Sequence, residues 1–410
     1  MTDQIECAVD DLRLGRALRY AIHDTSGVLL LAAGCTITAE TPRHLRARGI
    51  DSVLMHAADA RGGHPELPDR AVKLAFDDPD ELLNASDHRV RNIGPPARDS
   101  VVRHGRRAYN HRIHKQLVEQ RRQSCDTIEQ IHDDVVANED VDGMSVMQVS
   151  TNCMESLLAD IHDCVSVAFE AAGDMTVAEE SVRTAVLGMA VGVELGFDAS
   201  NVQALGSAGC LANVGQTTAT AEIRNARRSL TLSERLELQK VPGRSLDILE
   251  DFANTLNIVR VVVYQMHERP DGSGYPRRLS GERIHPFARI LRVADDYQAS
   301  LIGRQQSADE SPYGAMESLV RLAQERRVDP VVVRGHLHLL SLFPIGSFVR
   351  LSDGSDAKVL RSNGPEYTKP IVTRIQDADG ATTDEDDDQN LIDLSQSDLS
   401  VIQAVPNPSE

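Results

Sequence analysis

The amino-acid sequence predicts a mainly α-helical protein with a small α+β module near its start and a small antiparallel β unit near its end. Apolar residues recur at helical spacing through the central half of the 410-residue chain. Short alternating runs bounded by Gly, Asp and Asn lie on both sides of that region. A chain of this length has room for two or three units, since single domains commonly run to about 100–200 residues.

The N-terminal α+β module is expected over residues 1–56. This segment has short β-type runs, a turn at Thr25-Ser26-Gly27 and a helix that begins near Thr41-Pro42, where proline suits the first helical turn. Residues 57–104 are rich in Pro, Gly, Asp and Arg without clear periodicity, which predicts a linker.

Two long helices are predicted next, over about residues 105–138 and 144–172, from their apolar spacing. The first lies in a helical connector, 105–141, and begins with the basic stretch HGRRAYNHRIHKQ. We interpret this stretch as a solvated helix face or as a subunit contact that would make the protein a homodimer, with an anion site as the alternative. The main helical domain is expected over 142–343.

The C-terminal part is predicted to hold a small antiparallel β unit over residues 344–380. Apolar and polar residues alternate there around turns at Asp353-Gly354 and Asn363-Gly364. Residues 381–410 contain TDEDDDQ and little that could form a core, so we expect an acidic, disordered tail.

Composition excludes several classes of partner. The formal net charge of −19 repels phosphate backbones, so no nucleic-acid partner is expected. No apolar run approaches the length of about 18 residues that a membrane helix needs, and the start is polar, so we expect no membrane association and a cytoplasmic location. The six cysteines are scattered without a Cys-x-x-Cys pair, which indicates ordinary reduced thiols.

One pair of motifs is far more specific than the rest. The run from His267 to Pro276 reads HERPDGSGYP, and ERIHPFARILRVADDYQAS follows from Glu282 to Ser300. By itself the Asp-Gly-Ser-Gly-Tyr-Pro segment could be a plain turn. Together the two motifs closely resemble the HD-GYP family of bacterial phosphodiesterases.

The resemblance implies an HD-type helical bundle and a known chemistry. Members of this family hydrolyse cyclic di-GMP with a cluster of iron or manganese ions held by histidine and carboxylate side chains. Such ions lower the pKa of a bridging water, orient the phosphodiester and neutralise charge on the leaving oxygen. Loss of the ligands would therefore remove all three effects.

This sequence departs from the family pattern at most of the expected ligands. Ala212 and Asn213 stand where the name-giving His-Asp pair should be, and Gln216 stands where a lysine usually helps to bind phosphate. Val241 precedes a proline where relatives have histidine, and Met266 replaces the first histidine of His-His-Glu. Alanine, valine and methionine cannot coordinate a hard divalent ion, so we expect no catalytic residues.

What remains of the ligand set is His267, Asp295 and, where relatives carry histidine, Glu180. These three could hold a single ion, iron or manganese, if activity persists; otherwise no cofactor is expected. The alternative is that His267 and Asp295 now make ordinary core hydrogen bonds.

The loop is better preserved than the ligand set. Its family residues are all present, and two arginines stand near positions where relatives contact nucleotide phosphates. The candidate ligand- or partner-binding residues are Asp271, Gly272, Gly274, Tyr275, Pro276, Arg289 and Arg304. The resemblance implies cyclic di-GMP or a diguanylate cyclase-type protein as the partner; alternatively, the Gly and Pro residues only set the backbone of the fold.

Three function hypotheses follow. The first is a degenerate HD-GYP domain that acts in cyclic di-GMP signalling without cleaving the nucleotide. The second is a weak or altered metal-dependent phosphodiesterase, and the third is a structural scaffold. Two other His-Asp pairs, His132-Asp133 and His162-Asp163, lie before the first core helix of the family, so we interpret both as helix-surface residues.

Overall fold

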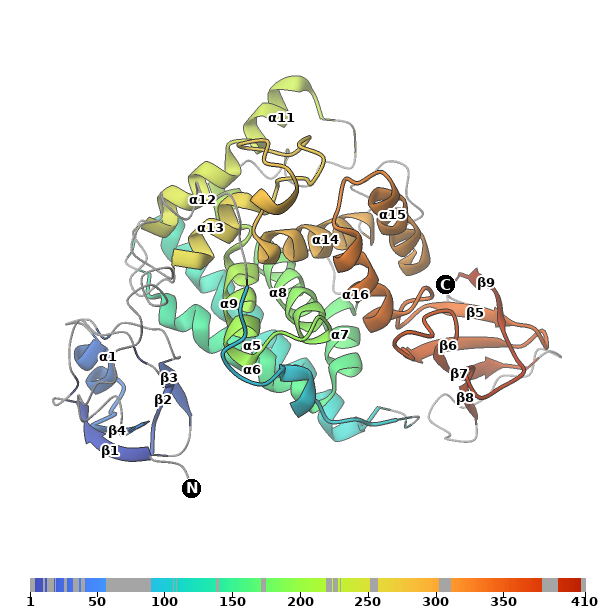
Figure 1. Ribbon diagram of the computed structural model, residues 1–410, viewed down its shortest axis with the longest axis horizontal. Helices are drawn as coiled ribbons and strands as arrows, with labels where there is room; N and C mark the ends of the chain where they lie inside the picture. The colour runs from blue at the N-terminus through green and yellow to red at the C-terminus, as the bar shows by residue number, and fades with distance from the viewer. Residues whose placement is uncertain are drawn as a thin grey trace. The chain divides into compact units, whose positions relative to one another are not determined.

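The chain forms two compact units, residues 1–77 and 78–410, which are described separately. The prediction of a mainly helical fold framed by two small antiparallel sheets is confirmed (Figure 1). The computed structural model describes residues 4–9, 12, 18, 20–25, 28–31, 37, 41–56, 90–105, 107, 109–137, 139, 141–170, 175–218, 223, 228, 230–250, 257–301, 311–377 and 390–406.

The N-terminal unit contains a four-stranded antiparallel sheet in the order β1-β4-β2-β3. Its elements are β1 (Gln4–Ala8), β2 (Ile22–His23), β3 (Leu29–Leu31), α1 (Thr41–Ala47) and β4 (Ser52–His56). The helix begins at Thr41, where Pro42 predicts it. Leu45 of α1 is fully buried and packs with Val53 of β4 in a small apolar core.

The helical body surrounds helix α8, which is buried along almost its whole length. A capping box between Thr176 and Glu179 fixes its start, and this satisfies two backbone amides that the helix leaves unpaired. The helices of the body are α5 (His111–Ala137), α6 (Gly143–Ala159), α7 (Ile161–Phe169), α8 (Val177–Glu194), α9 (Ala199–Leu211), α11 (Leu232–Leu238), α12 (Val241–Glu250), α13 (Asn257–Gln265), α14 (Pro286–Leu301), α15 (Pro312–Gln324) and α16 (Pro330–Leu340), with short 3₁₀ turns η2 (Ala97–Ser100), η3 (Val214–Thr218) and η4 (Gly281–Arg283).

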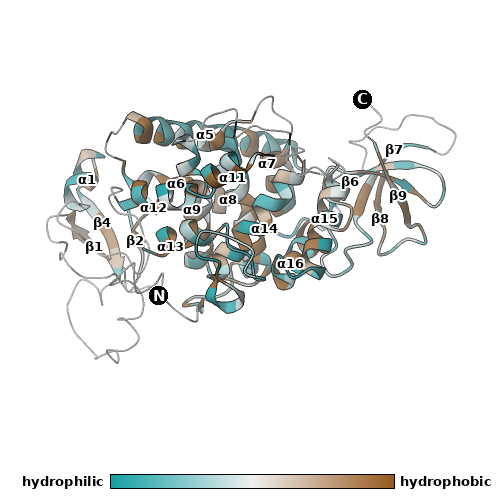
Figure 2. Cartoon of the chain, turned by 90° about the horizontal axis from the view of Figure 1, so that it is seen from above, coloured by the Kyte–Doolittle hydropathy of each residue, from teal (hydrophilic) through white to brown (hydrophobic). Residues whose placement is uncertain are grey.

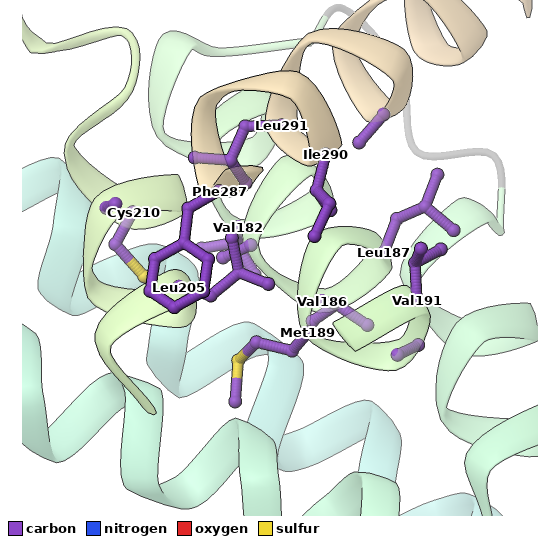
Figure 3. Packing of buried hydrophobic residues seen from close by; sticks show 14 of the residues in the cluster. Val182, Val186, Leu187, Met189, Val191, Leu205, Cys210, Phe287, Ile290 and Leu291 are labelled. Atoms are coloured by element: carbon purple, nitrogen blue, oxygen red, sulfur yellow. The ribbon is translucent and has the colours of Figure 1, made fainter. Parts of the chain in front are cut away.

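Helices α8, α9 and α14 enclose the main apolar core. Figure 3 labels Met189 of α8, Leu205 of α9 and Phe287 of α14 among the residues of this core, and all three are shielded from water. Helices α8 and α9 approach so closely at Gly209 that an added Cβ would lie 2.5 Å from the Cα of Ala185. Outer helices such as α5 and α14 carry both polar and apolar residues, as expected where one face is buried (Figure 2).

The single helix expected over 144–172 is wrong, because the structure has two helices that meet at Asp160. Asp160 is extended, with φ −157° and ψ 100°. Its carboxylate accepts a hydrogen bond from the amide of Asp163 at 3.2 Å and so caps α7. The helix is therefore interrupted at Asp160, although the apolar spacing continues across it. Within the described residues, no helix has the length and hydropathy needed to cross a membrane.

The C-terminal sheet has five antiparallel strands in the order β8-β7-β6-β5-β9. They are β5 (Phe348–Leu351), β6 (Asp356–Arg361), β7 (Ile371–Gln376), β8 (Leu391–Asp393) and β9 (Val401–Val405). The prediction that 381–410 is a disordered tail is therefore wrong for residues 390–406. Strands β8 and β9 are short, and they pair with β7 and β5, a long-range pairing that a composition argument does not see.

A buried ion pair joins this sheet to the helical body. The guanidinium of Arg361 on β6 donates to both carboxylate oxygens of Asp160, at 2.8 and 2.7 Å. It also lies over the ring of Tyr109, 4.8 Å from the centroid, while Tyr109 donates its hydroxyl to the carbonyl of Leu360. The side chains of Arg361 and Asp160 are 3% and 2% exposed, so this junction is a fully buried polar network.

Candidate functional site

The candidate ligand positions lie on or beside six elements of the helical body. Glu180 lies in the first turn of α8 and is buried. Ala212 and Asn213 follow the end of α9, Gln216 lies in η3, and Val241 begins α12. Met266 and His267 follow α13, and Asp295 lies on α14. Apolar Ala212, Val241 and Met266 are at most 2% exposed, so these positions offer no donor atoms and little access to water.

The polar replacements at the His-Asp position bond to each other. The side-chain amide of Gln216 donates from Nε2 to the side-chain oxygen Oδ1 of Asn213 at 2.6 Å, and Asn213 is fully buried. The nitrogen of the Asn213 amide has no partner within the described part of the chain. Two neutral amides therefore stand where the resemblance implies an anionic ligand and a cation.

Arg292 contacts two of the three residual candidate ligands. Its Nη1 lies 3.3 Å from Nδ1 of His267 and 3.5 Å from Oδ2 of Asp295. Its Nε donates to Asp296 at 3.1 Å, and Nη2 bonds to the other oxygen of the same carboxylate. Arg269 donates to Asp296 as well, at 3.2 Å. Two arginines thus supply positive charge beside these carboxylates.

The electrostatics of this cluster follow from burial and the two guanidinium groups. Burial, with help from Arg292, lowers the pKa of His267 to about 3, so the ring is neutral at physiological pH. Burial would raise the pKa of Asp296, but Arg292 and Arg269 outweigh it and hold the pKa below its usual value. Asp296 and Asp295 likewise raise the pKa of Arg292 against the effect of burial.

The donor set does not fit a metal cluster. Among the described residues, no group of three His, Cys, Asp or Glu side chains is arranged so that it could hold an ion. Glu180 is on α8, and the carbonyl of this residue accepts from Gln298 on α14 at 3.5 Å. His267, Asp295 and Glu180 are thus on three packed elements but do not form a common ligand sphere.

The loop after His267 is tightly folded. The ring of Tyr275 stacks on that of His267 with centroids 5.1 Å apart and planes 7° apart. Asp271 accepts from the amide and hydroxyl of Ser273, at 2.9 and 2.7 Å, which closes a turn that Gly272 continues with φ +79°. The Tyr275-Pro276 bond is cis.

The buried side chain of Glu268 holds the backbone of this loop in place. It is 1% exposed, and its carboxylate accepts the backbone amides of Arg277 at 2.6 Å and Leu279 at 2.9 Å. Gly274 passes directly over this residue, since an added Cβ would lie 2.5 Å from the Cα of Glu268 and 2.3 Å from the nitrogen of Arg269. Only glycine fits there.

Of the two arginines predicted to contact phosphate, the structure describes only Arg289. Arg289 pairs with Asp329 at 2.5 Å, so its guanidinium already has a carboxylate partner. Arg304 lies outside the described residues.

Sequence reasoning missed Arg292, Asp296 and Arg269. A signal was present: within ILRVADDYQ, Arg292 precedes Asp295 and Asp296 by three and four residues, the spacing at which helical side chains meet. The prediction that the two other His-Asp pairs lie on helix surfaces holds for Asp133, which is exposed, and is wrong for one residue of each pair. His132 is buried, and Asp163 is fully buried, with its carboxylate 2.7 Å from Nδ1 of His114.

Comparison with known proteins agrees with this architecture. Residues 171–332 match the family model of the HD domain. A cyclic di-GMP phosphodiesterase of Pseudomonas aeruginosa, PA4108, is 30% identical over 193 residues, or 47% of this chain and 46% of that protein. The cyclic di-GMP phosphodiesterase PdeB of Borreliella burgdorferi is 26% identical over 200 residues, or 48% of this chain and 51% of that protein.

Among solved structures, Bd1817, an HDGYP protein from Bdellovibrio bacteriovorus, aligns with a TM-score of 0.46 and 14% identity, over 82% of this chain and 98% of that one. The chain spans about half the length of the two phosphodiesterases named above. The residues that match the HD-domain model contain the motifs around His267 and Asp295. Residues 171–332 are therefore similar to the HD domain, and about half of the chain is similar in sequence to cyclic di-GMP phosphodiesterases.

Proposed function

We propose that this protein is a degenerate HD-GYP signalling protein that acts in cyclic di-GMP signalling by binding the nucleotide or a partner protein without hydrolysing the nucleotide. A diguanylate cyclase-type protein is the candidate partner. The binding residues would be those of the loop from Asp271 to Pro276, which keeps a defined backbone although the ligand positions beside it are lost.

One observation carries the absence of turnover. The guanidinium of Arg292 lies within 3.5 Å of both His267 and Asp295, which are two of the three surviving candidate ligands. A guanidinium does not lose its proton, carries no coordinated water and cannot act as a Lewis acid toward a phosphodiester. Nearby, Ala212, Val241 and Met266 supply no replacement ligands.

Metal-dependent hydrolysis is the second candidate function. It is favoured by the names of the relatives and by the survival of Glu180, His267 and Asp295 on neighbouring elements. Iron or manganese bound by these three residues would then supply the activated water. A purely structural scaffold is the third candidate.

The deciding experiment is cyclic di-GMP turnover by purified protein loaded anaerobically with iron or manganese. An Asp295→Ala variant is measured beside it. We expect no turnover above that of the variant, together with thermal stabilisation by cyclic di-GMP in the presence of EDTA. Metal-dependent turnover that Asp295→Ala abolishes would refute the proposal and establish the phosphodiesterase. If the protein shows no turnover and no stabilisation by the nucleotide, binding of a partner protein remains as its function. Capture of a purified diguanylate cyclase tests that function.

A further inference from the structure

An exposed stripe of side chains runs along one face of α5. Each residue of the stripe follows the one before it by three or four positions, the spacing that keeps side chains on a single face of a helix. All of them are exposed, and all except the last are charged. The stripe consists of Arg112, Lys115, Glu119, Arg122, Asp126, Glu129, Asp133 and Val136.

The charges of this stripe run against the polarity of the helix. Backbone dipoles favour anions near the N-terminus of a helix and cations near its C-terminus. In α5 the cations Arg112 and Lys115 lie near the start and form the cationic end of the stripe. The anions Glu129 and Asp133 lie toward the end of the helix and form the anionic end. This order is unfavourable for an isolated helix, which points to a stabilising contact outside α5.

The middle of the stripe is neutralised within the helix, whereas its two ends are not. Arg122 pairs with Glu119 at 2.7 Å and with Asp126 at 2.7 Å, one turn to either side. Within the described part of the chain, no side chain pairs with the cationic end or with the anionic end. Both ends are therefore available to charges of a second molecule.

The stripe is complementary to itself when a second copy of α5 lies antiparallel to it. In a two-fold interface each residue faces a partner, and symmetry repeats that pair. With the midpoint between Gln120 and Arg121 on the two-fold axis, every facing pair within residues 112–129 of the stripe joins opposite charges. The facing pairs are Arg112 with Glu129, Lys115 with Asp126, and Glu119 with Arg122. A parallel arrangement in register would instead place each charge against its own copy.

We propose that two copies of this chain associate through antiparallel α5 helices, with the cationic end of one stripe on the anionic end of the other. The 27 residues of α5 span about 40 Å, so the contact extends over several turns. A cavity of about 930 Å³ between α5 and α6, lined in part by Arg112 and Lys115, leaves room for side chains of the second copy. The inference goes beyond the proposed function, since it holds whether or not a cyclic dinucleotide binds.

The dimer should be weak and sensitive to salt. Exposed ion pairs contribute little each, and dissolved ions screen them. Sedimentation velocity of the full chain over a range of protein concentrations, without nucleotide, measures the dissociation constant of the dimer. We expect wild type to dimerise in about 50 mM NaCl, with a dissociation constant roughly tenfold higher in about 500 mM NaCl.

Charge reversal at either end of the stripe should abolish dimerisation. Arg112→Glu with Lys115→Glu makes both ends of the stripe anionic, and Asp126→Lys with Glu129→Lys makes the first half and much of the second half cationic. Each double variant should therefore be monomeric in about 50 mM NaCl, because like charges face each other in its dimer. The second variant has a net charge less negative than −19. Repulsion between whole molecules would favour its association, so a monomer there assigns the loss to the stripe.

An equimolar mixture of the two double variants is the matched control. Opposite charges then face each other again at both ends, so the mixture should form a heterodimer with an affinity close to that of wild type. Circular dichroism establishes that each variant is folded. If a double variant does not fold, the facing substitutions Lys115→Glu and Asp126→Lys, in separate chains, take its place with the same expected result.

Three results would overturn the inference. Wild type that stays monomeric in about 50 mM NaCl would show that the stripe does not join two copies. Dimers that persist in both double variants would place the interface on another surface. A mixture that associates no better than its separate components would show that the facing pairs are wrong. None of these measurements contains cyclic di-GMP, so their failure and a failure of the turnover experiment are read independently.

Discussion

The guanidinium of Arg361 forms two parallel bonds to the carboxylate of Asp160, across 201 positions of sequence. The pair connects the C-terminal sheet to the point where α6 ends and α7 begins. Because neither side chain contacts water appreciably, removal of one partner leaves the other as a buried, uncompensated charge.

Arg361→Ala should therefore lower the free energy of unfolding by about 3–5 kcal/mol. Denaturant unfolding followed by circular dichroism measures this loss. Arg350→Ala is the matched control, since Arg350 makes a similar pair with Asp356 at 2.8 Å but is 45% exposed. The control should lose at most about 1 kcal/mol. Equal losses in the two variants would show that burial does not distinguish these pairs.

Gly274→Ala should destabilise the loop that follows His267. The added methyl group would meet backbone atoms of Glu268 and Arg269, which cannot rotate away, so we expect a loss of about 1–3 kcal/mol. Gly243→Ala in α12 is the control, because its methyl group would meet nothing within 4 Å. Alanine there should stabilise the helix by about 0.5–1 kcal/mol. Thermal unfolding of both variants tests the contrast, and a tolerated Gly274→Ala would contradict the tight packing of the loop.

Asp198 performs two tasks with one carboxylate. One oxygen accepts the amide of Asn201 and caps α9, while the other accepts the amides of Ile93 at 2.6 Å and Gly94 at 2.9 Å. Asp198→Ala should cost about 1 kcal/mol for the cap and about 1–3 kcal/mol more for the two orphaned amides.

Asp142→Ala serves as the comparison for Asp198→Ala. Asp142 caps α6 through the amide of Met144 at 3.0 Å, so its loss should cost about 1 kcal/mol. Urea unfolding gives both values. Equal losses of unfolding free energy in Asp198→Ala and Asp142→Ala would mean that the bonds from Asp198 to the segment before η2 add nothing to stability.

His336 should make stability depend on pH. It is fully buried on α16, Nδ1 bonds to the carbonyl of Val332 at 3.0 Å, and burial lowers its pKa from 6.5 to about 4. Below pH 6.5 the unfolded chain binds a proton here that the folded chain does not. The contribution is thus complete above about pH 6.5 and is lost as pH falls toward 4, with a slope of up to about 1.4 kcal/mol per pH unit.

Denaturant unfolding between pH 7 and pH 4.5 measures that slope. His336→Gln, which does not titrate, should reduce it. His111→Gln, at an exposed histidine, should leave it unchanged. The assignment to His336 fails if wild type and His336→Gln show the same slope.

The helical body was predictable because its helices are long and carry strong apolar periodicity. The break at Asp160 was not, since a lone aspartate in a periodic run looks solvated until its partner, Arg361, is known. Strands β8 and β9 were also missed, because they are short, follow a strongly acidic run and depend on pairing with β7 and β5.

The candidate site was predictable only as a set of positions. Motif spacing assigns His267 and Asp295 to one region, and the structure places both against Arg292. Periodicity states which face of α14 carries Arg292, but the contact with His267 depends on how α14 packs against the loop after α13. That packing is set by long-range contacts that no local pattern records.

Arg292 is joined by the backbone to Asp295 and Asp296, the carboxylates it contacts. A positive charge built into the chain is present once in every molecule, at a ratio that dilution cannot change. Unlike a contact with a separate molecule, the pairing of Arg292 with these two carboxylates needs no binding step and does not weaken when the protein is diluted.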